Sequence, residues 1–298
     1  MNDNTKYAKT ITLKDGRTLG YAELGNSNGK PVFYFNGFPS SRLEARAGEE
    51  DIEKTGIHLI SIDRPGIGLS DPKPKRTFLD WPDDVLELAD ALNIKKFAVI
   101  GISGGGPYSL ACAYKIPPNR LVAAATCGGM GPFEAGLEGM KKSNVKLFTI
   151  AKKMPWILRF LFWVGYTRKV KNADDAYKML LAGMDDFPEA DQKLFKDPKL
   201  GKLFAEESFE AFRQGSKWVA HECKLYAQPW EFKLEDISPE IKVFIFHGEL
   251  DDQVPIGMAQ YMANLIPNCE AIYFPNETHF GAALNRIEEM ISKISNLI

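Results

Sequence analysis

The chain has 298 residues, of which 45% are hydrophobic and 26% are charged, and its formal net charge is −2 at pH 7. A chain of this length and composition can bury a large core, which excludes a disordered protein and a small scaffold held by disulfides or metals. The near-neutral charge gives no basic field to attract nucleic acid, so we expect no nucleic-acid partner.

Eight strand-like segments lie toward the two ends of the chain. They are Thr10–Leu13, Arg17–Leu24, Pro31–Phe35, Ile57–Ile62, Phe97–Ile102, Leu121–Thr126, Lys242–His247 and Glu270–Phe274. Several are unbroken runs of β-branched and aromatic residues, as in Val243-Phe244-Ile245-Phe246. Such runs are typical of strands covered on both faces, which predicts a parallel sheet.

Helical patterns alternate with these strands. They cover Ser41–Thr55, Trp81–Leu92, Gly104–Lys115, Ile256–Leu265 and Gly281–Ile294. Alternating strands and helices indicate a doubly wound α/β fold, in which helices cover both faces of the sheet.

The middle of the chain, residues 131–229, has a different character. It contains no convincing strand, helical patterns dominate it, and glycine and proline residues punctuate both of its edges. We therefore expect a core formed by residues 1–130 and 230–298, with residues 131–229 as a helical insertion between the sixth and seventh strands.

One half of this insertion is basic and rich in aromatic residues. Between Gly139 and Ala173 lie nine lysines or arginines and no acid, interleaved with a Trp-, Phe- and Leu-rich run from Met154 to Trp163. Two interpretations are open. The apolar residues either close over an active site while the charges face water, or rest on an anionic lipid surface. We expect the first, and therefore no membrane contact.

The sharpest motif is Gly101-Ile102-Ser103-Gly104-Gly105, between a predicted strand and a predicted helix. This is the arrangement of a nucleophile elbow, in which a tight turn lifts a serine hydroxyl out of the sheet and small neighbours let the backbones pass. We predict that Ser103 is a catalytic nucleophile.

A serine hydroxyl needs a base, and the base needs an acid to orient it. The chain has only four histidines. His58 opens a predicted core strand, His221 lies in the insertion and His247 ends a strand. His279 lies in a loop between the last strand and the last helix, which is where the base is expected.

The acid is expected in the loop after the seventh strand. This loop, Gly248 to Pro255, contains Glu249, Asp251 and Asp252. We predict Asp251, with the other two as rivals, because the alternative position after the sixth strand holds no carboxylate.

Two backbone N–H groups should stabilise the oxyanion that forms when serine attacks a carbonyl. The residue after the nucleophile, Gly104, supplies one. The turn Asn36-Gly37-Phe38-Pro39, after the third strand, supplies the second, and we predict the N–H of Phe38.

With these motifs, the sequence resembles the α/β-hydrolase superfamily over nearly its whole length, in its serine-nucleophile, capped, esterase-like branch. Asp63-Arg64-Pro65-Gly66-Ile67-Gly68-Leu69-Ser70 is a further shared signature. The resemblance implies an eight-stranded, mostly parallel sheet with a helical cap after the sixth strand. It also implies an acyl-Ser103 intermediate, hydrolysed by a water that His279 activates. Dehalogenases and epoxide hydrolases carry Asp at the position of Ser103, which argues against both activities. Many relatives have His where this chain has Asn36.

We therefore predict a serine hydrolase, a carboxylesterase acting on a small or medium apolar ester. The same triad also serves lactone, thioester, amide and C–C bond hydrolysis and hydroxynitrile lyases, and a triad-bearing receptor or regulator is a further alternative. No histidine–carboxylate cluster has metal spacing, so we expect no metal and no cofactor. The polar first ten residues lack the apolar run of a secretory signal, so we expect a cytoplasmic protein.

Overall fold

A computed structural model describes residues 3–298 of the chain. Within this range eight strands form one sheet, in the order β1-β2-β4-β3-β5-β6-β7-β8. The strands are β1 (Lys9–Thr12), β2 (Thr18–Gly25), β3 (Pro31–Phe35), β4 (His58–Ile62), β5 (Phe97–Ile102), β6 (Leu121–Cys127), β7 (Lys242–Gly248) and β8 (Cys269–Phe274). The pairs β1–β2 and β2–β4 are antiparallel and all others are parallel, which confirms the predicted mostly parallel sheet.

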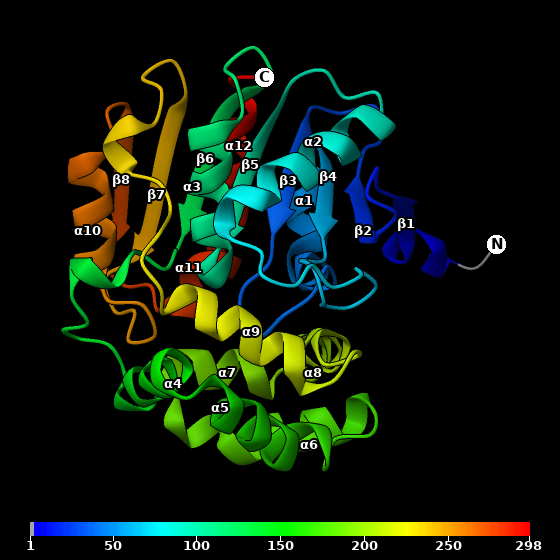
Figure 1. The fold of residues 1–298 in the computed structure, drawn as a ribbon, viewed down its shortest axis with the longest axis vertical. Helices are drawn as coiled ribbons and strands as arrows, with labels where there is room; N and C mark the ends of the chain where they lie inside the picture. The colour runs from blue at the N-terminus through cyan, green and yellow to red at the C-terminus, as the bar shows by residue number, and fades with distance from the viewer. Residues whose placement is uncertain (1–2) are drawn as a thin grey trace.

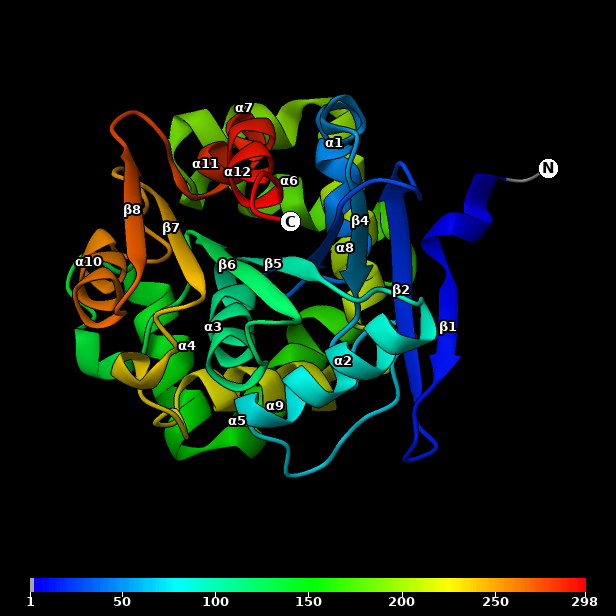
Figure 2. The same ribbon diagram turned by 90° about the horizontal axis from the view of Figure 1, so that it is seen from above.

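Helices cover both faces of this sheet, as Figure 2 shows. One face carries α2 (Trp81–Ala91), α3 (Gly106–Lys115) and α10 (Ile256–Leu265), and the other carries α1 (Glu49–Thr55), α11 (His279–Asn285) and α12 (Ile287–Ser295). The central strands β4 and β5 are buried at every position, since helices cover both of their faces.

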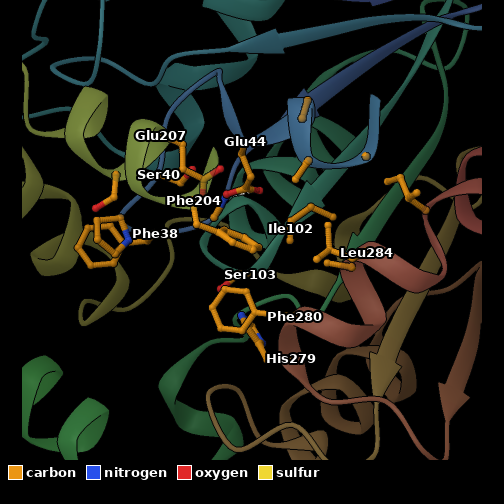
Figure 3. Close-up of a pocket in the computed structure, with 18 of the residues that line it drawn as sticks. Phe38, Ser40, Glu44, Ile102, Ser103, Phe204, Glu207, His279, Phe280 and Leu284 are labelled. Carbon is orange, nitrogen blue, oxygen red and sulfur yellow. Dashed lines mark hydrogen bonds between the residues drawn. The ribbon is translucent and has the colours of Figure 1, made fainter. Parts of the chain in front are cut away.

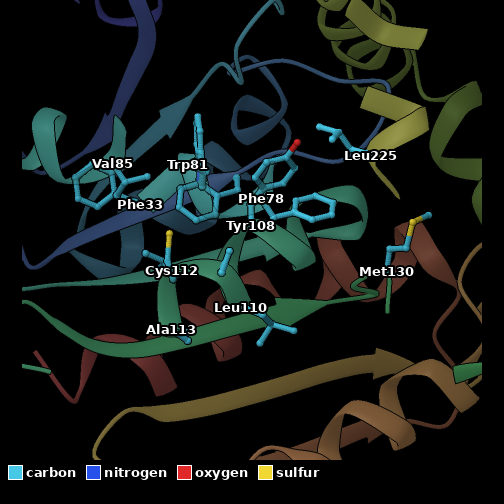
Figure 4. Close-up of a cluster of buried hydrophobic side chains, with 14 of the residues drawn as sticks. Phe33, Phe78, Trp81, Val85, Tyr108, Leu110, Cys112, Ala113, Met130 and Leu225 are labelled. Atoms are coloured by element: carbon cyan, nitrogen blue, oxygen red, sulfur yellow. The ribbon is translucent and has the colours of Figure 1, made fainter. Parts of the chain in front are cut away.

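Aromatic side chains form much of the core on the α2–α3 face (Figure 4). The ring of Tyr108, on α3, packs edge-on against Phe78 and Trp81 at centroid distances of 5.0 and 5.7 Å. Burying a side chain of this kind contributes about 1.5–3 kcal/mol to folding. This packing holds α3, and with it the turn that precedes α3, against the sheet.

Two predicted helices differ in detail from the structure. The segment expected as one helix over Ser41–Thr55 begins with a 3-10 turn at Glu44–Gly48 and becomes α-helical only at Glu49. The helix expected over Gly281–Ile294 is two helices, of which the second begins at Ile287. The first begins at His279 rather than Gly281, because the side chain of Thr278 caps it by accepting a hydrogen bond from the N–H of Gly281.

Residues 131–229 form only helices and loops between β6 and β7. The helices are α4 (Lys142–Lys153), α5 (Pro155–Phe162), α6 (Ala173–Gly183), α7 (Glu189–Lys196), α8 (Pro198–Ala211) and α9 (Ser216–Tyr226), with a π-helical turn at Trp163–Thr167. Figure 1 shows them gathered beyond the carboxyl ends of the parallel strands. No helix in residues 3–298 is both long enough and apolar enough to cross a bilayer.

The expectation that the apolar residues of α5 and its flanks close over the site is met only in part: Leu158 is buried and Phe162 packs against Phe38, but the others do not pack inward. Five of them face outward and are 40–71% exposed: Met154, Trp156, Phe160, Leu161 and Trp163. The physical reason is that α5 is apolar on all sides while only one side, that of Leu158, packs into the core.

Candidate active site

Ser103 lies at the carboxyl end of β5, where the chain turns sharply into α3. Its φ of +50° is left-handed, a strained conformation for a residue other than glycine. The two flanking glycines make this turn sterically possible. A Cβ on Gly101 would lie 2.2 Å from the carbonyl oxygen of Gly105, and a Cβ on Gly105 would lie 2.0 Å from that of Phe35. The local geometry is therefore that of the expected elbow.

Asp251 and His279 come from the loops after β7 and β8 and meet at the same edge of the sheet. The distance between Asp251 Oδ2 and His279 Nδ1 is 2.6 Å, and both residues are buried. The other carboxylate oxygen, Oδ1, accepts hydrogen bonds of 2.9 Å from the N–H groups of Gln253 and Val254. Oδ1 of Asp251 thus holds its own loop, while Oδ2 orients the imidazole of His279. This leaves Nε2 of His279 available as a base.

The charge of Asp251 also changes the pKa of His279. Burial alone would lower the pKa of His279, but the charge of Asp251 and its hydrogen bond outweigh this effect and raise the pKa above its usual value. Asp191, on α7, adds to this rise. It is fully buried and accepts a hydrogen bond from Thr278, the residue before His279.

The two rival acids make another contact or face solvent, whereas Nε2 of the rival base His247 lies 3.5 Å from Asp251 Oδ2. Asp252 accepts a hydrogen bond from the side chain of Gln253, and Glu249 is exposed. His247 is fully buried, its Nε2 lies 2.9 Å from the carbonyl oxygen of Val254, and burial lowers its pKa. The structure therefore brings His279 together with Asp251 rather than with the other two candidate acids.

The two expected oxyanion donors, Phe38 and Gly104, are neighbours. A Cβ on Gly104 would lie only 2.9 Å from the Cβ of Phe38 and 2.6 Å from the hydroxyl of Tyr226. The turn that carries Phe38 also faces the serine, since a Cβ on Gly37 would lie 3.4 Å from the Cβ of Ser103. Substitution of either glycine would crowd this region.

The backbone around Gly37 is held from both sides. Arg64 Nη1 donates to the carbonyl oxygen of Asn36, and Arg64 Nη2 donates to that of Gly37 at 2.7 Å. The N–H of Gly37 donates to the carboxylate of Glu44 at 2.8 Å. The side-chain oxygen of Asn36 lies 3.3 Å from Arg64 Nη1, so Asn36 itself adds only a weak contact to this arrangement.

Arg64 is held in turn by a residue from α9. Glu222 forms ion pairs with both Arg64, at 2.6 Å, and Arg76, and accepts hydrogen bonds of 2.8 and 2.7 Å from the hydroxyls of Tyr108 and Tyr226. Burial alone would raise the pKa of Glu222, but the charges of Arg76 and Arg64 lower it to about 2. This network links the helices of residues 131–229 to the turn that carries Phe38.

A largely apolar pocket opens beside Ser103 and His279 (Figure 3). It encloses about 1010 Å³, counting the space at its mouth. Its apolar walls come from both the sheet side and helices α6 to α8, and include Ile102, Leu180, Phe195, Phe204 and Leu284. A pocket of this kind accommodates a small or medium organic molecule.

Sequence reasoning missed three carboxylates at this site: the buried Asp191 and Glu207 and the half-buried Glu44. None belongs to a catalytic motif, and acids in helical or loop segments usually face solvent. For Glu44, its position eight residues after Asn36 in the same loop was the only available signal.

The comparisons with known proteins agree with this fold. The sequence profile for the alpha/beta hydrolase fold matches residues 30–283. A probable proline iminopeptidase of Leptolyngbya boryana is 24% identical over 289 residues, covering 88% of this chain and 85% of the relative. A bifunctional esterase/perhydrolase of Acinetobacter calcoaceticus is 23% identical over 278 residues, covering 90% and 92%.

Among solved structures, an esterase from Rhodococcus sp. superposes with a TM-score of 0.68 at 20% identity, covering 98% of this chain and 100% of the other. At this identity the likeness concerns the fold alone. The profile match covers most of the chain, including both the Ser103 turn and His279. The chain therefore belongs to the alpha/beta hydrolase fold family.

Proposed function

We propose that this protein is a serine hydrolase that cleaves carboxylic esters, with Ser103, His279 and Asp251 as its triad. The observation that carries the proposal is the 2.6 Å contact between Asp251 and His279. His279 lines the same pocket as Ser103, whose backbone has the left-handed conformation of a tight turn. In this proposal residues 131–229 form a cap over a core of residues 1–130 and 230–298.

The first half of the reaction acylates the serine. Ser103 Oγ attacks the ester carbonyl carbon while His279 Nε2 takes the hydroxyl proton. The resulting oxyanion accepts hydrogen bonds from the N–H groups of Phe38 and Gly104. When the tetrahedral intermediate collapses, the C–O bond to the alcohol breaks, and the proton held by His279 passes to the leaving alcohol.

The second half releases the acid. A water molecule loses a proton to His279 Nε2 and attacks the acyl carbon, again forming an oxyanion. The bond to Ser103 Oγ then breaks, and the serine recovers its proton from the histidine. Asp251 stays ionised throughout and stabilises the imidazolium that forms in each half.

The apolar walls of the pocket favour a small or medium apolar acyl chain, since burying each methylene group is worth about 0.8 kcal/mol. Amide hydrolysis is the second candidate. It is supported by the proline iminopeptidase relative, which covers most of the chain, and the same steps apply with an amine as the leaving group.

The proposal is tested by substituting the nucleophile. Ser103→Ala should abolish hydrolysis of p-nitrophenyl butanoate and labelling by a fluorophosphonate, while Ser143→Ala, at an exposed serine of α4, should change neither. Thermal unfolding of both variants checks that they are folded. A folded Ser103→Ala protein that is labelled at the wild-type rate contradicts the proposal. Turnover of aminoacyl anilides without turnover of esters favours the amide candidate.

A further inference from the structure

Two carboxylates that the proposed mechanism does not use line the same pocket as Ser103. They are Glu44, in the 3-10 turn before α1, and Glu207, on α8. Figure 3 shows Glu44, Ser40 and Glu207 gathered on one side of the pocket, while Ser103, His279 and Phe280 lie on the other. The two acids therefore form a polar end in an otherwise apolar space.

Glu44 is anchored in place. Its Oε1 accepts a hydrogen bond of 2.7 Å from the hydroxyl of Tyr34, and its Oε2 accepts one of 2.8 Å from the N–H of Gly37. These donors favour its ionised form, although its burial opposes it. Glu44 thus presents a fixed acceptor at the pocket wall.

Glu207 has weaker support: the Ser40 side chain and the charge of Arg46 lower its pKa, but burial and the charge of Glu44 outweigh them and raise it. Glu207 is only 6% exposed, and its Oε2 has no hydrogen-bond partner in the part of the chain that the structure describes. Within residues 3–298 neither Glu44 nor Glu207 forms an ion pair, and the nearby Arg46 pairs with Glu206 instead. Burying a carboxyl group without a partner costs free energy of folding. A further hydrogen-bond donor or a cation at this place would offset that cost.

We propose that this end of the pocket binds a protonated amine, and that the substrate is an ester whose acyl chain carries one. The proposal rests on the proposed hydrolase function. An ammonium group supplies both features that the two acids lack, a positive charge and several N–H donors. Because the acyl chain stays attached to Ser103 between the two halves of the reaction, a subsite in the same pocket holds it throughout.

Without a bound cation, the pocket favours the neutral forms of both carboxyls. Burial raises the pKa of both carboxyls, and the charge of Glu44 raises the pKa of Glu207 further. A cation between them acts in the opposite direction, since it stabilises their charged forms. The side chain of Phe204 lies between the acids and the serine in Figure 3, with Ile102 and Leu284 to one side, and these apolar walls suit the methylene groups of such a chain.

Binding of the amine is tested first, without any need for turnover. n-Butylammonium and n-butanol have nearly the same shape and differ in charge. We expect n-butylammonium chloride to raise the thermal unfolding midpoint of the full chain, whereas n-butanol and potassium chloride at equal concentrations do not. Equal midpoints in n-butylammonium chloride and potassium chloride overturn the proposal.

The second experiment locates the site. Glu207→Gln removes the charge at constant shape, and Glu231→Gln is the control, because Glu231 is exposed and does not line the pocket. The first variant should weaken n-butylammonium binding about 10- to 100-fold, as expected for a lost charge-assisted hydrogen bond. The second should bind it like the wild type. Unchanged binding by a folded Glu207→Gln protein overturns the assignment. Should this variant fail to fold, the wild-type comparison above decides.

Matched esters separate this proposal from the proposed function. The pairs are ethyl β-alaninate with ethyl butanoate, ethyl γ-aminobutanoate with ethyl pentanoate, and ethyl ε-aminohexanoate with ethyl heptanoate. We expect a higher kcat/KM for the amino ester in at least one pair. Hydrolysis of the neutral esters with no preference for an amino ester in any pair overturns the amine subsite and leaves the hydrolase. Binding of n-butylammonium without turnover of any ester overturns the proposed function and leaves the amine subsite.

Discussion

The guanidinium of Arg64 donates a 2.7 Å hydrogen bond to the carbonyl oxygen of Gly37. That carbonyl belongs to the same peptide unit as the N–H of Phe38, and in a trans peptide the two groups point in opposite directions. Arg64 therefore fixes, from behind, the direction of the N–H group that we propose as an oxyanion donor. The relationship explains how the turn is held in a chain with Asn36 where many relatives have histidine.

This arrangement depends on Glu222, which pairs with Arg64 and Arg76 inside the protein. Glu222→Gln should lower the free energy of unfolding by about 3–5 kcal/mol, because it leaves buried guanidiniums without a counter-charge. Chemical denaturation measures this loss. The control is Glu189→Gln, at an exposed i,i+4 pair with Lys193, which should cost less than about 1 kcal/mol. Equal stabilities for the two variants contradict the role given to Glu222.

The pKa of Glu222 also sets a pH range for this contribution. Because its pKa is lowered from 4.5 to about 2 in the folded protein, its stabilisation is complete above pH 4.5 and is lost as the pH falls toward 2. Stability curves of wild type and Glu222→Gln should therefore converge on acidification. Curves that stay parallel down to pH 2 contradict this account.

The choice between the two adjacent acids is testable by substitution. Asp251→Asn should lower kcat by roughly three to four orders of magnitude, as loss of the orienting acid does in serine proteases. Asp252→Asn should have a far smaller effect, since its side chain contacts Gln253 rather than His279. Steady-state kinetics on p-nitrophenyl butanoate measures both. A larger loss for Asp252→Asn would show that the acid is assigned to the wrong residue.

The pH dependence of activity should report the pKa of His279. Catalysis requires the neutral imidazole, and the pKa of His279 is raised, so the acid limb of kcat/KM should lie above the ordinary histidine value of about 6.5. Asp191→Asn removes one of the charges that raise this pKa, and should move the limb to lower pH. An unchanged or upward-shifted limb in this variant contradicts the proposed influence of Asp191. Treatment with EDTA should leave the profile unchanged.

The outward-facing aromatic residues of α5 should not affect the chemistry. Trp156 and Phe160 are 71% and 57% exposed and do not line the pocket. The double variant Trp156→Ala/Phe160→Ala should keep kcat/KM for monomeric, water-soluble esters within about twofold, as expected for exposed sites. The assay is repeated with anionic vesicles. A salt-sensitive rate increase that the double variant loses would identify a lipid-contacting surface, contrary to the expectation of no membrane contact.

The sequence by itself determined most of the sheet and the shape of the Ser103 turn. The strands are local runs of β-branched and aromatic residues, and their observed bounds lie within a residue or so of the predicted ones. The glycine–serine pattern of the elbow is also local, and Gly101 is required by a contact within the turn itself, although the steric need for Gly105 comes from Phe35 on β3. The catalytic roles of Ser103, Asp251, His279, Phe38 and Gly104 remain predictions that the experiments above address.

Tertiary structure decided which side chains meet across the two parts of the chain. Glu222 and Glu207 lie on helices far along the sequence from Arg64 and Glu44, and no local pattern distinguishes them from solvent-exposed acids. Their burial results from packing helices α8 and α9 against the loops after β3 and β4, which hydrophobic periodicity does not specify. Tertiary packing also decided which apolar residues of α5 are exposed. They lie on all sides of the helix, so the sequence pattern does not indicate which side is buried.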